Sequence, residues 1–326
     1  MTPVFTSVLS AEMTDYLTLS GDTGMVIEPV KSLLKSLDQY LNEHNHADRT
    51  LPEEVISAWI ATQQVKNRTK ANRISTLRGF VRYLASSGIE ACVPEAPTVN
   101  SDYVPYVFSK EELMRIMSAA DNFGWKTVRN RSSSVFPVLL RILYGCGLRL
   151  NEGISLKWTD IDIDNGIITV RKGKNLKQRF VPVSRSLTGL LLMYKEKTQD
   201  ENICSDYLFE SGFHRGKPFT GHSFLVWFSA VLKKADIHYT RKNRYERGLC
   251  PHCLRHTFVL HSFLKSESEG RKFEDTSAFL SACLGHASLK ETDKYLHASH
   301  LVYTDSHKRV NDYIGNLIPE VCFDEN

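Results

Sequence analysis

Apolar residues recur with a helical period between residues 8 and 88. Two series repeat about every 3.6 residues: Val30, Leu33, Leu34, Leu37 and Leu41, then Ile74, Leu77, Val81 and Leu84. Pro29 suits the opening turn of a helix, and Gly88 suits a helix end. The pattern predicts that residues 8–88 are helical and that residues 1–92 form a small all-helical domain.

Prolines then interrupt the helical pattern. Pro94, Pro97 and Pro105 lie among polar residues, which is a composition typical of linkers. We therefore predict a linker over residues 93–108 and a second domain over residues 109–326. A length of 326 residues agrees with two domains.

The second domain combines helical patterns with two short β-branched runs. Residues 109–112 read Ser-Lys-Glu-Glu, which has the form of a capping box, and residues 135–144 are strongly apolar until Gly145. Residues 167–170 and 179–183 are rich in β-branched side chains and are separated by a polar turn, which indicates a hairpin. The predicted fold class is mainly α with a small β-sheet (α+β).

The composition favours an ordinary globular protein. Hydrophobic residues make up 42% of the chain and charged residues 24%, which is typical of globular domains. No apolar run approaches the roughly 18 residues that a membrane span requires, and the start lacks a basic-then-apolar signal peptide. We expect a cytoplasmic protein without a membrane partner.

The net charge of +4 decides little, but basic residues are clustered. The first group lies between residues 66 and 82, where no acidic residue interrupts it, and a second precedes the apolar run at 135–144. Such clusters are typical of surfaces that bind nucleic acid, although any one of them alone fits a solvated helix face. The candidate DNA-binding residues are Lys66, Arg68, Lys70, Arg73, Arg78, Arg82, Lys126 and Arg129.

The seven cysteines are an odd number spread over a long chain, which does not indicate a disulfide framework. Cys250 and Cys253 have the Cys-x-x-Cys spacing of redox pairs and of half a zinc site. The residues before them, 241–248, are polar and basic rather than strand-like, and no second ligand pair lies at short spacing. We predict no metal site. A thiol oxidoreductase is an alternative that requires both thiols to be exposed.

Three separated motifs carry candidate chemistry. Residues 145–152 read Gly-Cys-Gly-Leu-Arg-Leu-Asn-Glu, residues 252–258 read His-Cys-Leu-Arg-His-Thr-Phe, and residues 284–286 read Leu-Gly-His, with Tyr295 nine residues after the last histidine. Two arginines, two histidines and a tyrosine suit attack on a phosphodiester and stabilisation of its charged transition state. In wording, order and spacing, the motifs resemble the tyrosine recombinases, also called the phage integrase family.

The resemblance implies a role for each of these residues. Arg149 and Arg255 would bind the phosphate, His252 would bind phosphate or transfer a proton, and His286 would add a third cationic or hydrogen-bonding group. Tyr295 would be the nucleophile, with Tyr303 as its rival. His256 is interpreted as a packing residue or a support for the others. Residues 151–158 resemble the helix that follows the first arginine in the family.

A general acid is also needed to protonate the leaving 5′ oxygen. The family uses a lysine in a hairpin turn, and the segment 173–179 reads Gly-Lys-Asn-Leu-Lys-Gln-Arg. Lys174 aligns with the first lysine of the family wording. Lys172 and Lys177 remain candidates, because a hairpin turn fixes spacing less tightly than a helix does.

The resemblance also implies the architecture and the reaction. Residues 1–92 would be a helical core-DNA-binding (SAM-like) domain, and residues 109–326 a tyrosine-recombinase catalytic domain with a C-terminal helix that docks on a partner subunit. Two domains would hold double-stranded DNA from opposite sides, and a homotetramer would act on two paired sites. Because a 3′-phosphotyrosyl link conserves the energy of the broken bond, we expect no cofactor, neither ATP nor a metal.

Two features depart from the commonest family wording. Position 253 is a cysteine, and the stretch between Arg255 and His286, with its polar segment 266–272, is longer than in compact members. The longer stretch resembles recombinases of mobile elements, which favours integration, excision or transposition. The alternatives are a chromosome- or plasmid-resolving recombinase, a type IB topoisomerase-like enzyme, and an inactive DNA-binding regulator with this fold.

Overall fold

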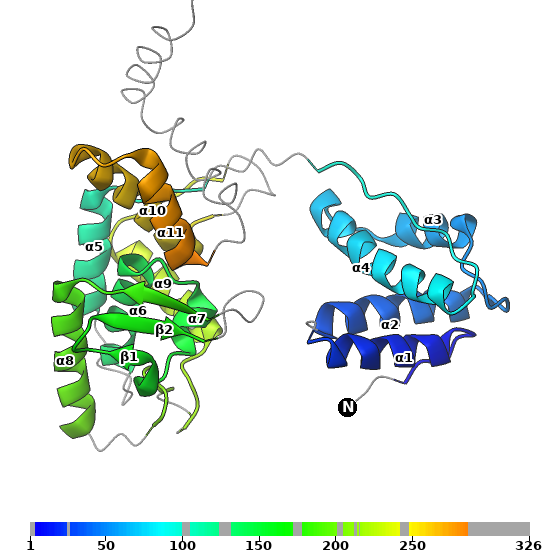
Figure 1. Cartoon of the computed structure of the whole chain (residues 1–326), viewed down its shortest axis with the longest axis horizontal. Coiled ribbons are helices and arrows are strands. Elements are labelled where there is room, and N and C mark those ends of the chain that lie inside the picture. Colours follow the sequence, from blue (N-terminus) through cyan, green and yellow to red (C-terminus); the bar gives the residue numbers. More distant parts are fainter. Residues whose placement is uncertain are drawn as a thin grey trace, which may run out of the picture. The chain divides into compact units, whose positions relative to one another are not determined.

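The computed structural model describes the chain in segments. The described residues are 4–24, 27–99, 105–123, 132–171, 178–200, 205–211, 214, 216–241 and 248–285. The chain divides into two compact units, Met1–Asp102 and Tyr103–Asn326 (Figure 1). The division falls within residues 93–108, the stretch that contains the three prolines.

The first unit is helical throughout its described elements. These are α1 (Ser10–Asp22), α2 (Ile27–Glu43), α3 (Glu53–Thr62) and α4 (Asn67–Ser86). Both apolar series of the sequence are buried, and all their members except Ile74 belong to one core, where α1 and α2 pack on each other and on α4 (Figure 1). Gly88 follows the end of α4 with a φ of 77°, a left-handed conformation that glycine adopts without steric cost. The helical prediction for this part is confirmed.

The second unit is mainly helical. Its helices are α5 (Lys110–Asp121), α6 (Ser132–Gly145), α7 (Leu150–Ile154), α8 (Arg185–Asp200), α9 (Gly221–Lys234), α10 (His252–Ser268) and α11 (Phe273–Leu284). The predicted capping box is present, since Ser109 accepts from the Glu112 backbone while the Glu112 carboxylate accepts from the Ser109 backbone. Apolar residues of α6, α9 and α10 share one core, so the elements that carry the first two motifs are held together.

A small antiparallel sheet completes the described part of this unit. Its strands are β1 (Ile161–Asp162), β2 (Ile167–Val170) and β3 (Arg179–Pro182), in the order β1-β2-β3. Ile168 pairs with Val181 and both are buried, whereas Phe180 is exposed on the other face. The hairpin and the fold class are therefore confirmed: a mainly helical chain with a small three-stranded sheet.

One element is shorter than the sequence predicted. The helix expected over residues 151–158 ends at Ile154, and Lys157 instead forms an isolated bridge with Tyr207 before a 3-10 turn over Trp158–Asp160. Gly153 packs against α6 so closely that a Cβ would lie 2.9 Å from a Leu143 methyl group. Close packing selects glycine here, and glycine lowers the stability of a longer helix.

Among the described residues, no helix is long and apolar enough to cross a membrane.

Candidate active site

Arg149 is placed by a tight turn after α6. Gly147 has a φ of 59°, and a Cβ at this position would lie 2.4 Å from a ring carbon of Phe258. Glycine is therefore required both for the turn and for the approach of α10. The turn places Arg149 immediately before α7, at its N-cap. There its backbone N–H donates to Glu152 Oε2 at 2.9 Å.

Arg255 lies on α10 and is almost completely buried, with 1% of its surface exposed. Its Nη1 donates to the carbonyl oxygen of Gly147 at 2.9 Å, and its Nη2 donates to that of Leu284 at 2.9 Å. The guanidinium thus joins the turn before Arg149 to the end of α11. Two backbone carbonyls fix its plane without neutralising its charge.

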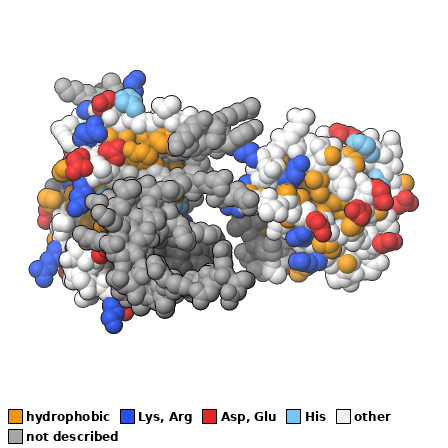
Figure 2. Space-filling view, turned by 90° about the horizontal axis from the view of Figure 1, so that it is seen from above, with side chains coloured by type: hydrophobic (Ala, Val, Ile, Leu, Met, Phe, Trp, Pro, Cys, Tyr) orange, Lys and Arg blue, Asp and Glu red, His pale blue; other side chains and the backbone are white. Residues whose placement is uncertain are grey.

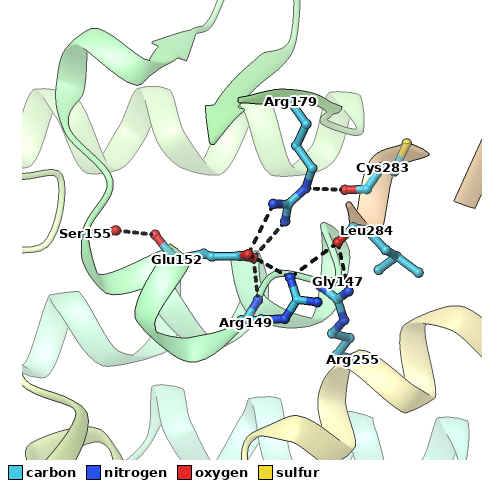
Figure 3. Close-up of polar contacts among 8 residues, drawn as sticks. All are labelled: Gly147, Arg149, Glu152, Ser155, Arg179, Arg255, Cys283 and Leu284. Atoms are coloured by element: carbon cyan, nitrogen blue, oxygen red, sulfur yellow. Dashed lines mark hydrogen bonds and ion pairs between the residues drawn. The ribbon is translucent and has the colours of Figure 1, made fainter. Parts of the chain in front are cut away.

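Both motif arginines converge on one carbonyl group. The oxygen of Leu284 accepts from Arg255 and also, at 3.5 Å, from Arg149 Nη1 (Figure 3). α11 ends there, because Gly285 adopts the left-handed conformation with a φ of 64°. Residues 149, 255 and 284 are far apart in sequence, yet the fold brings them to one point.

Two further residues complete this group. Glu152 accepts from Arg149 Nη1 at 2.9 Å and forms a bidentate ion pair with Arg179, whose Nη1 and Nη2 lie 3.1 and 2.7 Å from the two carboxylate oxygens. Arg179 Nε also donates to the carbonyl oxygen of Cys283 at 2.7 Å. We call Arg149, Glu152, Arg179 and Arg255 the arginine cluster (Figure 3).

The arginine cluster carries an excess of positive charge. Burial raises the pKa of Glu152, but hydrogen bonds from Arg179 and from Arg149 outweigh it, so this pKa lies below its ordinary value and the carboxylate is ionised at neutral pH. The cluster therefore contains three guanidinium groups but only one carboxylate, which contacts Arg149 and Arg179. The Arg149 side chain is 27% exposed, against 9% for Arg179. An anion such as a phosphate would complete the charge balance at the exposed side of Arg149.

His252 is the first residue of α10, one turn before Arg255. Its ring is half-buried and lies edge-on to that of His256, with the centroids 4.6 Å apart. His256 is thus a direct neighbour of the candidate histidine, in keeping with the packing role expected for it. The start of α10 therefore holds a histidine and an arginine three residues apart.

Cys250 and Cys253 lie together just before and within the first turn of α10. Their sulfur atoms are 3.8 Å apart, and Cys253 is 1% exposed. A hydrogen bond with Cys250 and burial raise the pKa of the Cys253 thiol well above its ordinary value. A buried, protonated thiol is a poor nucleophile, so the exposed thiol pair required by an oxidoreductase is absent here. The described residues contain no group of three His, Cys, Asp or Glu side chains placed to hold a metal ion.

Several predicted residues lie outside the described segments. They are Lys174 with its alternatives Lys172 and Lys177, His286, Tyr295, Tyr303, Lys126 and Arg129. The structure does describe their chain neighbours at two points. The hairpin strands that flank residues 172–177 are β2 and β3, and Gly285 directly precedes His286.

The candidate DNA-binding residues near α4 differ in their exposure. Lys66, Arg68 and Arg82 are exposed, whereas Lys70, Arg73 and Arg78 are half-buried. Arg73 donates to the Gln63 side chain, and Arg78 Nε donates to the Pro94 carbonyl at 2.7 Å. On the face drawn in Figure 2, Lys and Arg side chains gather toward one side of the N-terminal unit. Arg73 and Arg78 have partners within the protein that sequence reasoning did not anticipate.

Glu152 and Arg179 were also missed as site residues. The sequence did carry a signal for Glu152, because it follows Arg149 by three residues and helix starts favour a glutamate there. Arg179 is the last residue of the polar segment 173–179, in which only lysines were considered as catalytic candidates. Its contact with Glu152 joins residues 27 positions apart and has no local signature.

Comparisons with known proteins show the family. The model of the phage integrase family matches residues 107–301. The tyrosine recombinase XerC of Staphylococcus carnosus (strain TM300) is 27% identical over 264 residues, covering 77% of this chain and 79% of that protein. The tyrosine recombinase XerD of Listeria monocytogenes serotype 4b (strain F2365) is 27% identical over 259 residues, covering 76% and 78%.

Solved structures share the fold at lower identity. The XerH site-specific recombinase in a post-cleavage complex with palindromic difH substrate has a TM-score of 0.62 and 19% identity, covering 88% of this chain and 77% of that one. A lambda integrase (75-356) dimer bound to a COC′ core site has a TM-score of 0.61 and 14% identity, covering 87% and 94%. The Tn1549 transposon integrase with a circular intermediate DNA has a TM-score of 0.58 and 15% identity, covering 87% and 94%.

Proposed function

The chain belongs to the phage integrase family and is a tyrosine-type site-specific recombinase, and we propose that it cuts and rejoins double-stranded DNA through a 3′-phosphotyrosyl intermediate. One observation carries the proposal. Arg149 and Arg255 donate to the same Leu284 carbonyl oxygen, two residues before His286 in the chain. Two of the residues that the family chemistry needs, Arg149 and Arg255, therefore meet at one point through described contacts.

The two arginines would bind the non-bridging oxygens of the scissile phosphate. Phosphodiesters hydrolyse very slowly, so catalysis requires donors fixed where negative charge develops. Arg255 donates to two backbone carbonyls. Arg149 donates to the Glu152 carboxylate from its backbone N–H and from Nη1. Donors fixed in this way need little reorganisation when charge appears, and each is worth about 100- to 1,000-fold in rate.

The remaining groups would move protons and form the covalent bond. The Tyr295 oxygen attacks phosphorus as its proton passes to a histidine, the bond from phosphorus to the 5′ oxygen breaks, and Lys174 gives that oxygen its proton. A 5′ hydroxyl of a partner strand then returns a proton to Lys174 as it attacks the phosphotyrosine, and the tyrosine leaves with the proton held by the histidine. His252 and His286 would stabilise the phosphorane or transfer protons. The two steps balance without ATP, because the phosphodiester energy stays in the covalent link.

The partner we propose is double-stranded DNA, bound by a homotetramer on two paired sites. The exposed basic residues Lys66, Arg68 and Arg82 support contact with phosphates by the N-terminal unit. The C-terminal segment, which contains Val310, Tyr313 and Ile314, would dock on a neighbouring subunit. Removal of residues 306–326 is then expected to impair synapsis of two sites while leaving binding to one site.

Two biological roles compete, each favoured by a different observation. The long stretch between Arg255 and His286 favours integration, excision or transposition of a mobile element. The relatives named XerC and XerD favour a chromosome-resolving role instead. The DNA that the protein cleaves distinguishes them. Cleavage at the ends of a mobile element would support the first role, and cleavage at a single chromosomal locus would support the second.

Covalent trapping tests the proposed reaction. Nicked duplexes prepared from the genome that encodes the chain lose a short strand after cleavage, so the enzyme stays attached and can be recovered. We expect adducts with the wild type and with Tyr303→Phe, and none with Tyr295→Phe. A wild type that binds these duplexes yet forms no adduct would instead identify a DNA-binding regulator.

A further inference from the structure

Arg179 is an arginine with a largely buried side chain at the edge of the candidate site, and the proposed chemistry gives it no role. It is the first residue of β3 and directly follows the part of the hairpin that contains Lys174. Its side chain is 9% exposed. It pairs with Glu152 through two nitrogens and donates from the third to Cys283, so all three guanidinium nitrogens are used. A buried charge with this many partners fixes the elements that supply them.

These contacts join three elements that carry candidate residues. β3 continues from the Lys174 segment, Glu152 belongs to α7 next to Arg149, and Cys283 lies at the end of α11, just before His286. Arg179 also packs closely against the backbone of Gly285. A Cβ at Gly285 would lie 3.0 Å from Arg179 Cδ, and the φ of 64° already favours glycine there. Gly285 thus allows Arg179 to lie against the turn that leads to His286.

The ion pair also determines how Glu152 contacts Arg149. Because Arg179 takes both carboxylate oxygens, the Arg149 guanidinium reaches Glu152 through Nη1 only. An arginine beside an otherwise unshared carboxylate tends to form a bidentate pair, which would turn its donors away from a phosphate. Sharing of Glu152 therefore holds Arg149 through one side-chain nitrogen and keeps the guanidinium out of a bidentate pair.

We propose that Arg179 is a positioning residue for DNA cleavage. It orients Arg149 through Glu152, and it holds the hairpin that leads from Lys174 against the end of α11 that leads to His286. The proposal rests on the proposed recombinase function. Lysine cannot replace arginine in this role, because one ammonium group cannot pair bidentately with Glu152 and also reach the Cys283 carbonyl in the same fixed geometry.

The test compares Arg179→Lys with Arg171→Lys on a nicked duplex recovered by trapping with the wild type. Arg171 is a matched control, since it flanks the same 172–177 segment from the β2 side and pairs with the buried carboxylate of Asp160. Three quantities are measured for each protein: the DNA Kd, the fraction of enzyme that forms adduct, and the single-turnover cleavage rate of that fraction.

We expect Arg179→Lys to cleave on the order of 100-fold more slowly, as for a catalytic group displaced by about 1 Å. Its Kd should stay within about twofold of the wild type, and Arg171→Lys should cleave at nearly the wild-type rate. A structural role alone would lower the adduct-forming fraction and leave the rate of that fraction unchanged. That result, or equal rates for Arg179→Lys and the wild type, would overturn the proposal.

A double-mutant cycle with Glu152→Gln checks the route of the effect. If Arg179 acts through Glu152, adding Arg179→Lys to Glu152→Gln should slow cleavage by much less than the same change does in the wild type. Fully multiplicative effects would contradict action through Glu152. Failure of the recombinase function looks different, because the wild type itself would then form no adduct.

Discussion

Arg255 donates from Nη2 to the carbonyl oxygen of Leu284 across 2.9 Å. This bond ties the buried arginine of the second motif to the backbone that leads into the third. It fixes the end of α11 against α10, although the two bonded residues are 29 positions apart in the sequence. α11 ends at this point, because Gly285 adopts the left-handed conformation.

Arg255→Lys is expected to remove most of the cleavage activity. Lysine keeps the charge but cannot donate to both carbonyls and bind phosphate bidentately, so we expect a loss of at least about 100-fold in single-turnover cleavage. Arg115→Lys provides a control, because Arg115 also donates to a backbone carbonyl, that of Asp236, but on the surface and outside the arginine cluster. Comparable losses in both variants would contradict a specific role for Arg255.

Glu152→Gln is expected to lower stability at neutral pH by roughly 1–3 kcal/mol, because two arginines lose a charged acceptor. The folded-state pKa of Glu152 lies below 4.5, its ordinary value. Its ionisation therefore stabilises the fold above about pH 4.5, and this contribution is lost as the pH falls through the lowered pKa. Urea unfolding at pH 7 and near pH 4 should show the wild type and Glu152→Gln converging in acid. A difference in unfolding free energy between the two proteins that grows as the pH falls would contradict the prediction.

The lowered pKa of His261 predicts a second pH dependence of the protein's stability. Burial, with a further contribution from Lys110, lowers its pKa below the ordinary value of 6.5, and its Nδ1 lies 3.0 Å from the Tyr144 hydroxyl. The folded state thus favours the neutral ring. The stability that results is present above pH 6.5 and is lost as the pH falls through the lowered pKa. Relative to His261→Gln, the wild type should lose Tm between pH 7 and pH 5, and parallel Tm profiles would contradict this.

The exposed basic residues near α4 predict a salt-dependent contact with DNA. Arg68→Ala should weaken DNA binding and reduce the slope of log Kd against log salt concentration by about 1, as expected for one phosphate contact. Lys35→Ala is a control, because it removes one exposed positive charge from α2 instead. Equal changes in slope for the two variants would indicate only a general charge effect.

Local patterns accounted for much of the fold. The buried apolar series, the Ser109 capping box and the hairpin pairing of Ile168 with Val181 all follow from spacing and turn chemistry. α7 was expected to be longer, because spacing alone does not show that Gly153 is selected by contact with Leu143.

The candidate site was predictable where motifs are local. Arg149, His252 and Arg255 were identified from short runs, and the structure brings the two arginines together at Leu284. The Glu152–Arg179 pair was not identified, because it depends on how the hairpin packs on α7 and α11. The partners of Arg73 and Arg78 were missed for the same reason: a charge pattern does not show which charges the protein itself uses.

The most direct test of the shared phosphate site is mass spectrometry of the trapped, protease-digested adduct. We expect one modified peptide, carrying the 3′-phosphate end of the cleaved strand on Tyr295, with its yield lost in Arg149→Ala and in Tyr295→Phe. Linkage to any other residue, linkage through a 5′ phosphate, or an undiminished yield in Arg149→Ala would contradict the proposal that Arg149 and Tyr295 act on the same phosphorus atom.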